Sequence, residues 1–112
     1  MRSILLAAIF LSPMVMAKQS VMIDQTFCET RALLGKVAIE GRLRGESSED
    51  VKRDIEAIAN VTPADSIVRA VKPLGLLDVD GLFKTKRDYS PMQAYMDLHN
   101  TCRDLRGQIV SL

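Results

Sequence analysis

The sequence is poor in the residue types on which many catalytic and metal sites depend. Among 112 residues it has one histidine, two cysteines and no tryptophan, and 4% of its residues are aromatic. The cysteine and histidine spacing matches no zinc motif, and no phosphate-binding glycine loop or paired-carboxylate motif is present. His99 has no serine or cysteine arrangement beside it that would form a nucleophile and its base. We therefore predict that the protein is not an enzyme and holds no metal and no cofactor.

The first 17 residues have the pattern of a secretory signal peptide. Arg2 supplies the positive start, an apolar run follows, and residues 15–17 offer modest or small side chains to a signal peptidase. The stretch from Ile4 to Ala17 spans 14 residues, whereas a helix needs about 20 to cross a bilayer. We predict cleavage after Ala17, one domain over residues 18–112, and a location in the periplasm or outside the cell without stable membrane insertion.

The chain also lacks an excess of charge of either sign. Removal of residues 1–17 takes away one basic side chain, that of Arg2, and leaves 14 basic against 14 acidic residues. A balanced surface gives no electrostatic footprint for nucleic acid or for an anionic membrane. We therefore expect the partner to be another protein, of the cell envelope or outside it.

The two cysteines predict one disulfide, because cysteines of exported chains are usually oxidised in pairs. A bond between Cys28 and Cys102 closes a loop of about 75 residues, for which the chain-entropy model gives roughly 4 kcal/mol of stabilisation. That is a large fraction of the stability of a small domain. The bond is the most consequential single contact that the sequence predicts.

The longest helical pattern, Asp24 to Arg44, is the element around which we expect the fold to be organised. Its broad apolar face carries Phe27, Cys28, Leu34, Ala38, Ile39 and Leu43. A second apolar strip, Leu33 and Val37, lies on nearly the opposite side. A helix that is apolar on most of its circumference is usually buried, so we place this one at the centre of a bundle.

Three further helices are predicted from their capping signals. Ser47 and Ser90 each begin a capping box, and Thr62 precedes a proline suited to a first helical position. The helix that starts after Thr62 should stop near Lys72, because Pro73 follows.

The segment from Leu74 to Tyr89 has no helical periodicity. Asp80 and Gly81 lie between two apolar runs, which is the commonest short hairpin signal, although a short helix or a loop also fits. Because the disulfide requires the first and last helices to be antiparallel, we predict an all-α fold. It is a small four-helix up-down bundle, closed by one disulfide, with a short β-hairpin between the third and fourth helices.

Arg31 and Arg42 fall within the broad apolar face of the first helix. Their stems could pack at the edge of the bundle while their charged ends reach water, which is the interpretation we favour. Alternatively, one of them is half-buried and pairs with an acid on a neighbouring helix, such as Asp97 or Asp104. These four residues are the candidate buried ion pairs.

The candidate partner-binding residues are Leu82, Phe83, Lys84, Lys86 and Arg87. They combine an apolar anchor with a basic rim, which suits a partner surface with an acidic patch, and long loops are often functional. The alternative is that Phe83 only plugs the end of the bundle while the lysines are solvated, and we favour that alternative slightly.

The stretch Ile58–Ala64, IANVTPA, resembles part of the small periplasmic acid-stress chaperones, which are also helical with one disulfide. The chain departs from that family in cysteine placement, because Cys102 lies far beyond the matching segment. With one histidine, any acid switch would depend on carboxylates. The resemblance implies a holdase that protects other periplasmic proteins.

The function predicted from the sequence is that of an exported, non-enzymatic protein-binding module, such as an inhibitor or adaptor. The first alternative is the periplasmic stress chaperone. A second is a winged helix-turn-helix DNA-binding module, because residues 55–86 have the outline of helix, turn, helix and basic hairpin. The neutral charge and the signal peptide argue against DNA binding.

Overall fold

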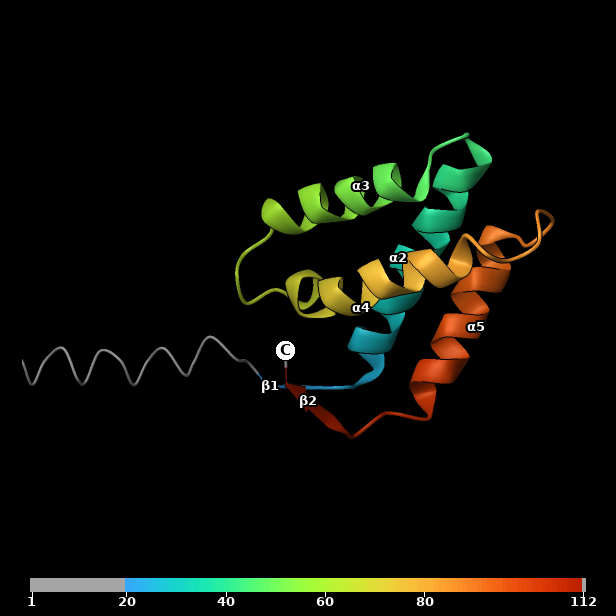
Figure 1. Cartoon of the computed structure of the whole chain (residues 1–112). Helices are drawn as coiled ribbons and strands as arrows, with labels where there is room; N and C mark the ends of the chain where they lie inside the picture. Colours follow the sequence, from blue (N-terminus) through green and yellow to red (C-terminus); the bar gives the residue numbers. More distant parts are fainter. Residues whose placement is uncertain (1–19, 112) are drawn as a thin grey trace, which may run out of the picture.

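The computed structural model describes residues 20–111 as four helices and one pair of short strands (Figure 1). The elements in chain order are β1 (Ser20–Met22), α2 (Gln25–Leu43), α3 (Ser48–Asn60), α4 (Ile67–Leu82), α5 (Pro91–Arg103) and β2 (Ile109–Ser111). The predicted signal peptide and the predicted new N-terminus, Lys18, lie outside the described residues. The prediction of an all-α domain with one disulfide is confirmed.

Helix α2 is the central element of the fold, because it contacts each of the other three helices. Its N-cap, Asp24, accepts a hydrogen bond from the amide of Phe27 at 2.9 Å, and Phe27 itself is fully buried. The second apolar strip is not buried as predicted, since Leu33 is 50% exposed. Leu43 was expected on the buried face but is 62% exposed, because it is the last residue of α2 and lies beyond the buried core.

The predicted capping boxes at Ser47 and Ser90 are both formed. In each, the serine hydroxyl accepts from the amide three residues on, and the side chain there accepts from the serine amide. Thr62 does not cap the next helix as predicted, because its hydroxyl donates instead to the carbonyl of Ala59. The cap of α4 is Ser66, which accepts from the amide of Arg69.

Helix α4 overturns the prediction of a helix end at Lys72 followed by a hairpin. It runs through Pro73 to Leu82, so the predicted hairpin is not formed, and Gly81 lies in its last turn. The buried side of α4, which comprises Val71, Gly75, Val79 and Leu82, continues at helical spacing on both sides of the proline. Burial of this stripe outweighs the one backbone hydrogen bond that the proline removes.

The two ends of the described chain are joined by three kinds of contact. The disulfide links Cys28 to Cys102, both fully buried, with their Cα atoms 5.5 Å apart. Strands β1 and β2 pair antiparallel, and Ile23 exchanges backbone hydrogen bonds of 2.8 Å with the turn at Gly107 and Gln108. Helix α5 ends at Arg103, and Gly107 forms this turn with φ of +88°.

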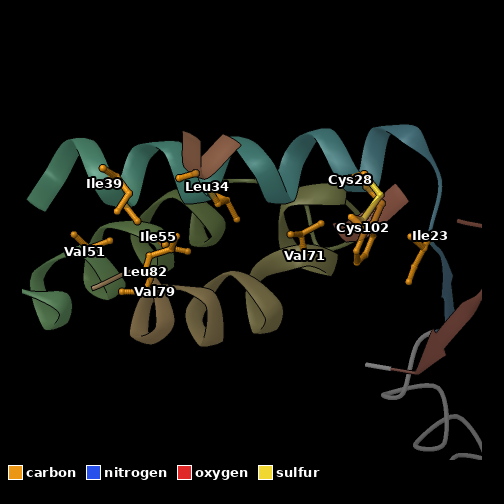
Figure 2. Close-up of a cluster of buried hydrophobic side chains, with 13 residues drawn as sticks. Ile23, Cys28, Leu34, Ile39, Val51, Ile55, Val71, Val79, Leu82 and Cys102 are labelled. Carbon is orange, nitrogen blue, oxygen red and sulfur yellow. A yellow bond between two sulfur atoms is a disulfide. The ribbon is translucent and has the colours of Figure 1, made fainter. Parts of the chain in front are cut away.

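Buried side chains from all four helices form one core (Figure 2). Ile55 and Val51 of α3, Val79 of α4 and Ile39 of α2 belong to it, and Val71 lies toward the disulfide end. Within residues 20–111, no helix combines the length and apolarity needed to cross a membrane. The up-down order of the helices remains a prediction.

Candidate functional site

A groove opens where the turn between α2 and α3 meets the loop between α4 and α5, at one end of the molecule (Figure 1). Its volume is about 690 Å³, within the range of ligand-binding clefts. It is lined by Arg42, Leu43, Gly45, Glu46, Ser47, Ser48, Phe83, Thr85 and Arg87. Two of the predicted partner-binding residues, Phe83 and Arg87, therefore lie in it.

Arg42 fixes the loop that forms one side of the groove. Its guanidinium donates to the carbonyls of Leu82, Thr85 and Lys86 at 3.0–3.2 Å. It also lies 5.9 Å from the centroid of the Phe83 ring, within cation–π range. The ion pair considered for Arg42 is not formed, since its half-buried guanidinium bonds to backbone carbonyls and to no acid of the last helix. It holds residues 82–86 in place.

The predicted partner-binding residues divide into a buried, an intermediate and an exposed group. Leu82 is 7% exposed and belongs to the core, so it is not part of the contact surface. Phe83 is half-buried, packing against the core from its position in the groove. Lys84, Lys86 and Arg87 are exposed. The packing of Phe83 against the core agrees with its predicted role as a plug, and its role in partner binding remains a prediction.

The residues of the α2–α3 turn that line the other side of the groove were not predicted from the sequence. Gly45, with φ of +90°, reverses the chain there, and Glu46 is fixed by an ion pair to Arg44 at 3.0 Å. The capping box of Ser47 signalled a turn at this point. Nothing local signalled that this turn would meet residues 83–87, because the contact depends on how α2 and α4 pack.

Arg31 follows the less favoured interpretation, an ion pair with an acid of a neighbouring helix, but the acid is Asp78 of α4. The Arg31 guanidinium donates to both carboxylate oxygens of Asp78, at 2.7 and 2.9 Å, and the two side chains are 12% and 13% exposed. The hydrogen bond to Asp78 raises the pKa of Arg31, against the opposing effect of burial. Asp78 was not predicted as the partner of Arg31, because the sequence analysis placed it in a hairpin and not in a helix.

The two acids predicted as partners of these arginines have other positions. Asp97 accepts a hydrogen bond of 2.5 Å from the hydroxyl of Tyr89. Burial of the phenol, followed by this hydrogen bond and the nearby charge, raises the pKa of Tyr89 to about 12. Asp104 is exposed at the C-cap of α5.

The other residues considered in the sequence analysis, among them His99, form no further candidate site in the described part of the chain. His99 stacks on Tyr95 with ring centroids 5.9 Å apart, on the surface of α5 beside the core. Among the residues that the structure describes, no group of three or more histidines, cysteines or acids could hold a metal ion. The basic wing on which the DNA-binding alternative depended is not formed, because its first strand belongs to α4.

Comparison with known proteins yields no family model, no curated protein and no solved structure that matches this chain.

Proposed function

We propose that the protein is an exported, non-enzymatic protein-binding module, an inhibitor or adaptor that holds its partner at the groove end of the molecule. One observation carries the proposal: the groove lies beside exposed cations that the fold itself does not use. Lys84, Lys86 and Arg87 form no ion pair with any described residue, whereas Arg31, Arg44, Lys52 and Arg53 each pair with an acid.

Export supports the expectation of a partner in the cell envelope or outside the cell. The signal-peptide pattern of residues 1–17 carries this part of the proposal, and the Cys28–Cys102 bond is compatible with it, because disulfides persist in oxidising compartments. The mature protein would begin at Lys18. Intact-mass measurement of material secreted by a bacterial host checks this, and a full-length chain held in the membrane fraction would overturn it.

A paired charge reversal tests the binding site. Lys84→Glu with Lys86→Glu should leave the melting temperature within about a degree or two, because surface substitutions rarely exceed ~0.5 kcal/mol. The same change should abolish affinity capture of the partner from the cell envelope. Unchanged capture would move the site elsewhere, with the exposed Leu33 and the neighbouring Val37 on α2 as the next candidate.

A matched control separates a local effect from a change in net charge. Arg103→Glu with Arg106→Glu makes the same charge change at the opposite end of α5, where both side chains are exposed. Capture should survive it. A small loss of stability is expected, because Arg103 stabilises the C-terminus of α5 by about 0.3–1 kcal/mol.

The stress-chaperone alternative is supported by a different observation, the exposed apolar side chains of the described surface. The largest are Met22, Leu33, Leu43, Ile58, Val61, Leu77, Met92 and Met96, each at least 42% exposed. Flexible methionines suit promiscuous binding. A holdase would suppress the aggregation of several unrelated unfolded proteins, whereas the adaptor proposed here would suppress none.

A further inference from the structure

The loop beside the groove carries three basic side chains that form no ion pair with any described residue. Lys84, Lys86 and Arg87 are exposed and follow one another in the loop after α4, and Asp88 is the only acid among residues 83–89. Three of the five N–H donors of the Arg42 guanidinium already bond to backbone carbonyls, so this side chain is held against the loop. The loop therefore offers three cations to an incoming ligand, and two of them belong to long, mobile lysine side chains.

The interior of the groove offers an apolar surface beside this charge. Leu43 and Phe83 both line it, although they are 40 residues apart in the sequence. Leu43 is 62% exposed at the end of α2. Covering its side chain would remove apolar surface from water, so Leu43 is a favourable anchor point for a ligand.

We propose that the groove takes a short acidic segment of the partner protein, with one apolar side chain against Leu43 and Phe83. The carboxylates of the segment then face Lys84, Lys86 and Arg87. This inference rests on the proposed function and adds the chemistry of the partner. Charge complementarity supports it, since three cations without an ion-pair partner beside Leu43 and Phe83 favour a ligand that is both anionic and apolar. The acid among the lining residues, Glu46, is already paired with Arg44. A groove of this volume admits a side chain and adjoining backbone, not a folded surface.

Selection from a random peptide library tests the inference even while the partner is unidentified. The bait is protein made from the full 112-residue chain and purified with its disulfide formed. Enriched peptides should carry two or more carboxylates near one leucine, methionine or phenylalanine. Leu43→Ser and Arg87→Glu should each weaken binding of a synthetic copy about tenfold or more, measured by fluorescence anisotropy.

Matched substitutions away from the groove provide the controls. Leu77→Ser replaces a leucine that is 69% exposed on α4, and Arg106→Glu reverses an exposed charge beyond α5. Each should change the affinity less than about twofold. Melting temperatures of all four variants establish that they are folded.

Each contrary result overturns the inference. These results are an absence of enrichment, enrichment of neutral or basic peptides, or binding that Leu43→Ser and Arg87→Glu leave unchanged. Binding of anionic vesicles or of a single-stranded oligonucleotide, sensitive to the same variants and without peptide enrichment, would also overturn it. The proposed function would survive any of these if capture from the envelope still required Lys84 and Lys86, and it would fail separately if capture did not.

Discussion

Arg31 and Asp78 show at the scale of single residues how a buried charge is tolerated in this core. The guanidinium meets the carboxylate with two hydrogen bonds, so each nearly buried charge is paired. Such a pair contributes little compared with apolar residues of the same volume, yet removal of one member leaves the other charge unpaired. The pair therefore fixes how α2 and α4 pack more than it adds to stability.

The first prediction follows from this asymmetry. Arg31→Met should lower the free energy of unfolding by about 3 kcal/mol, because it leaves the carboxylate of Asp78 without a cation. Arg31→Met combined with Asp78→Leu should restore most of that loss. Urea denaturation followed by circular dichroism measures both. Equal losses in the single and double variants would show that the two side chains do not interact.

Tyr89 supplies a second prediction at the same scale, with a direct optical readout. With Tyr95→Phe as background, Tyr89 is the only tyrosine, and its phenol should titrate near pH 12 by absorbance. Asp97→Asn should lower this pKa but leave it above 10, because burial is the largest cause of the shift. Ionisation near pH 10 in the protein with Asp97 intact would contradict the hydrogen bond to Asp97.

The raised pKa of Tyr89 also has a consequence for stability against pH. The folded state binds this proton more tightly than the unfolded state, whose tyrosine has a pKa of about 10. The contribution is therefore complete below pH 10 and is lost as the pH rises from about 10 toward 12. Asp97→Asn should make this alkaline loss smaller.

At the scale of elements, the local signals predicted the starts of α3 and α5, gave Thr62 in place of Ser66 as the cap of α4, and failed inside α4. Capping boxes at Ser47 and Ser90 depend on residues three apart, so the sequence shows them directly. Pro73 and the pair Asp80–Gly81 gave equally local signals for a helix end and a turn. Those signals were overridden by burial of the α4 stripe against α2 and α3, and packing between elements is not visible in a sequence window.

Gly81 distinguishes the helix from the predicted hairpin. In α4 it has ordinary helical geometry, and nothing lies within 4 Å of an added Cβ. Gly81→Ala should therefore raise the free energy of unfolding by about 0.5–1 kcal/mol, seen as a melting temperature a few degrees higher. In a hairpin turn this glycine would require positive φ, and alanine would be destabilising. A lower melting temperature of Gly81→Ala would therefore favour the hairpin over the helix.

Gly35→Ala is the companion substitution within a packed helix. An added Cβ would overlap the Cδ1 atom of Leu98, so α2 and α5 would have to move apart or Leu98 change its rotamer. Overpacking of this kind costs about 1–3 kcal/mol, more than the helix propensity gained. The same change, glycine to alanine, should therefore have opposite signs at positions 35 and 81.

At the scale of the whole molecule, the disulfide was predictable and the groove was not. Two cysteines allow one intramolecular pairing, and the fold brings Cys28 and Cys102 together as expected. The groove needs two loops about 40 residues apart to meet. The sequence indicated the 83–87 side through its composition, although the loop is shorter than predicted because α4 runs to Leu82. It could not show that Leu43 and Glu46 would complete the site.

Loss of the disulfide should affect the whole domain, because it joins the first and last helices. Cys28→Ser or Cys102→Ser should cost about 2–5 kcal/mol, the range for native disulfides of small secreted domains. The backbone pairing of Ile23 with Gly107 and Gln108 would then be the remaining link between the ends. Thermal melting with and without reductant measures this, and equal melting temperatures would show that the bond has no stabilising effect.

The most direct test of the central claim, that the partner binds at the groove end, is photocrosslinking in the cells that export the protein. A photoreactive residue at Lys84 should give a discrete adduct with the partner. The same residue at Asn60, exposed at the other end of α3 and about 20 Å along it from Ser47, should give none. Identical adducts from both positions, or an adduct from Asn60 alone, would contradict the account.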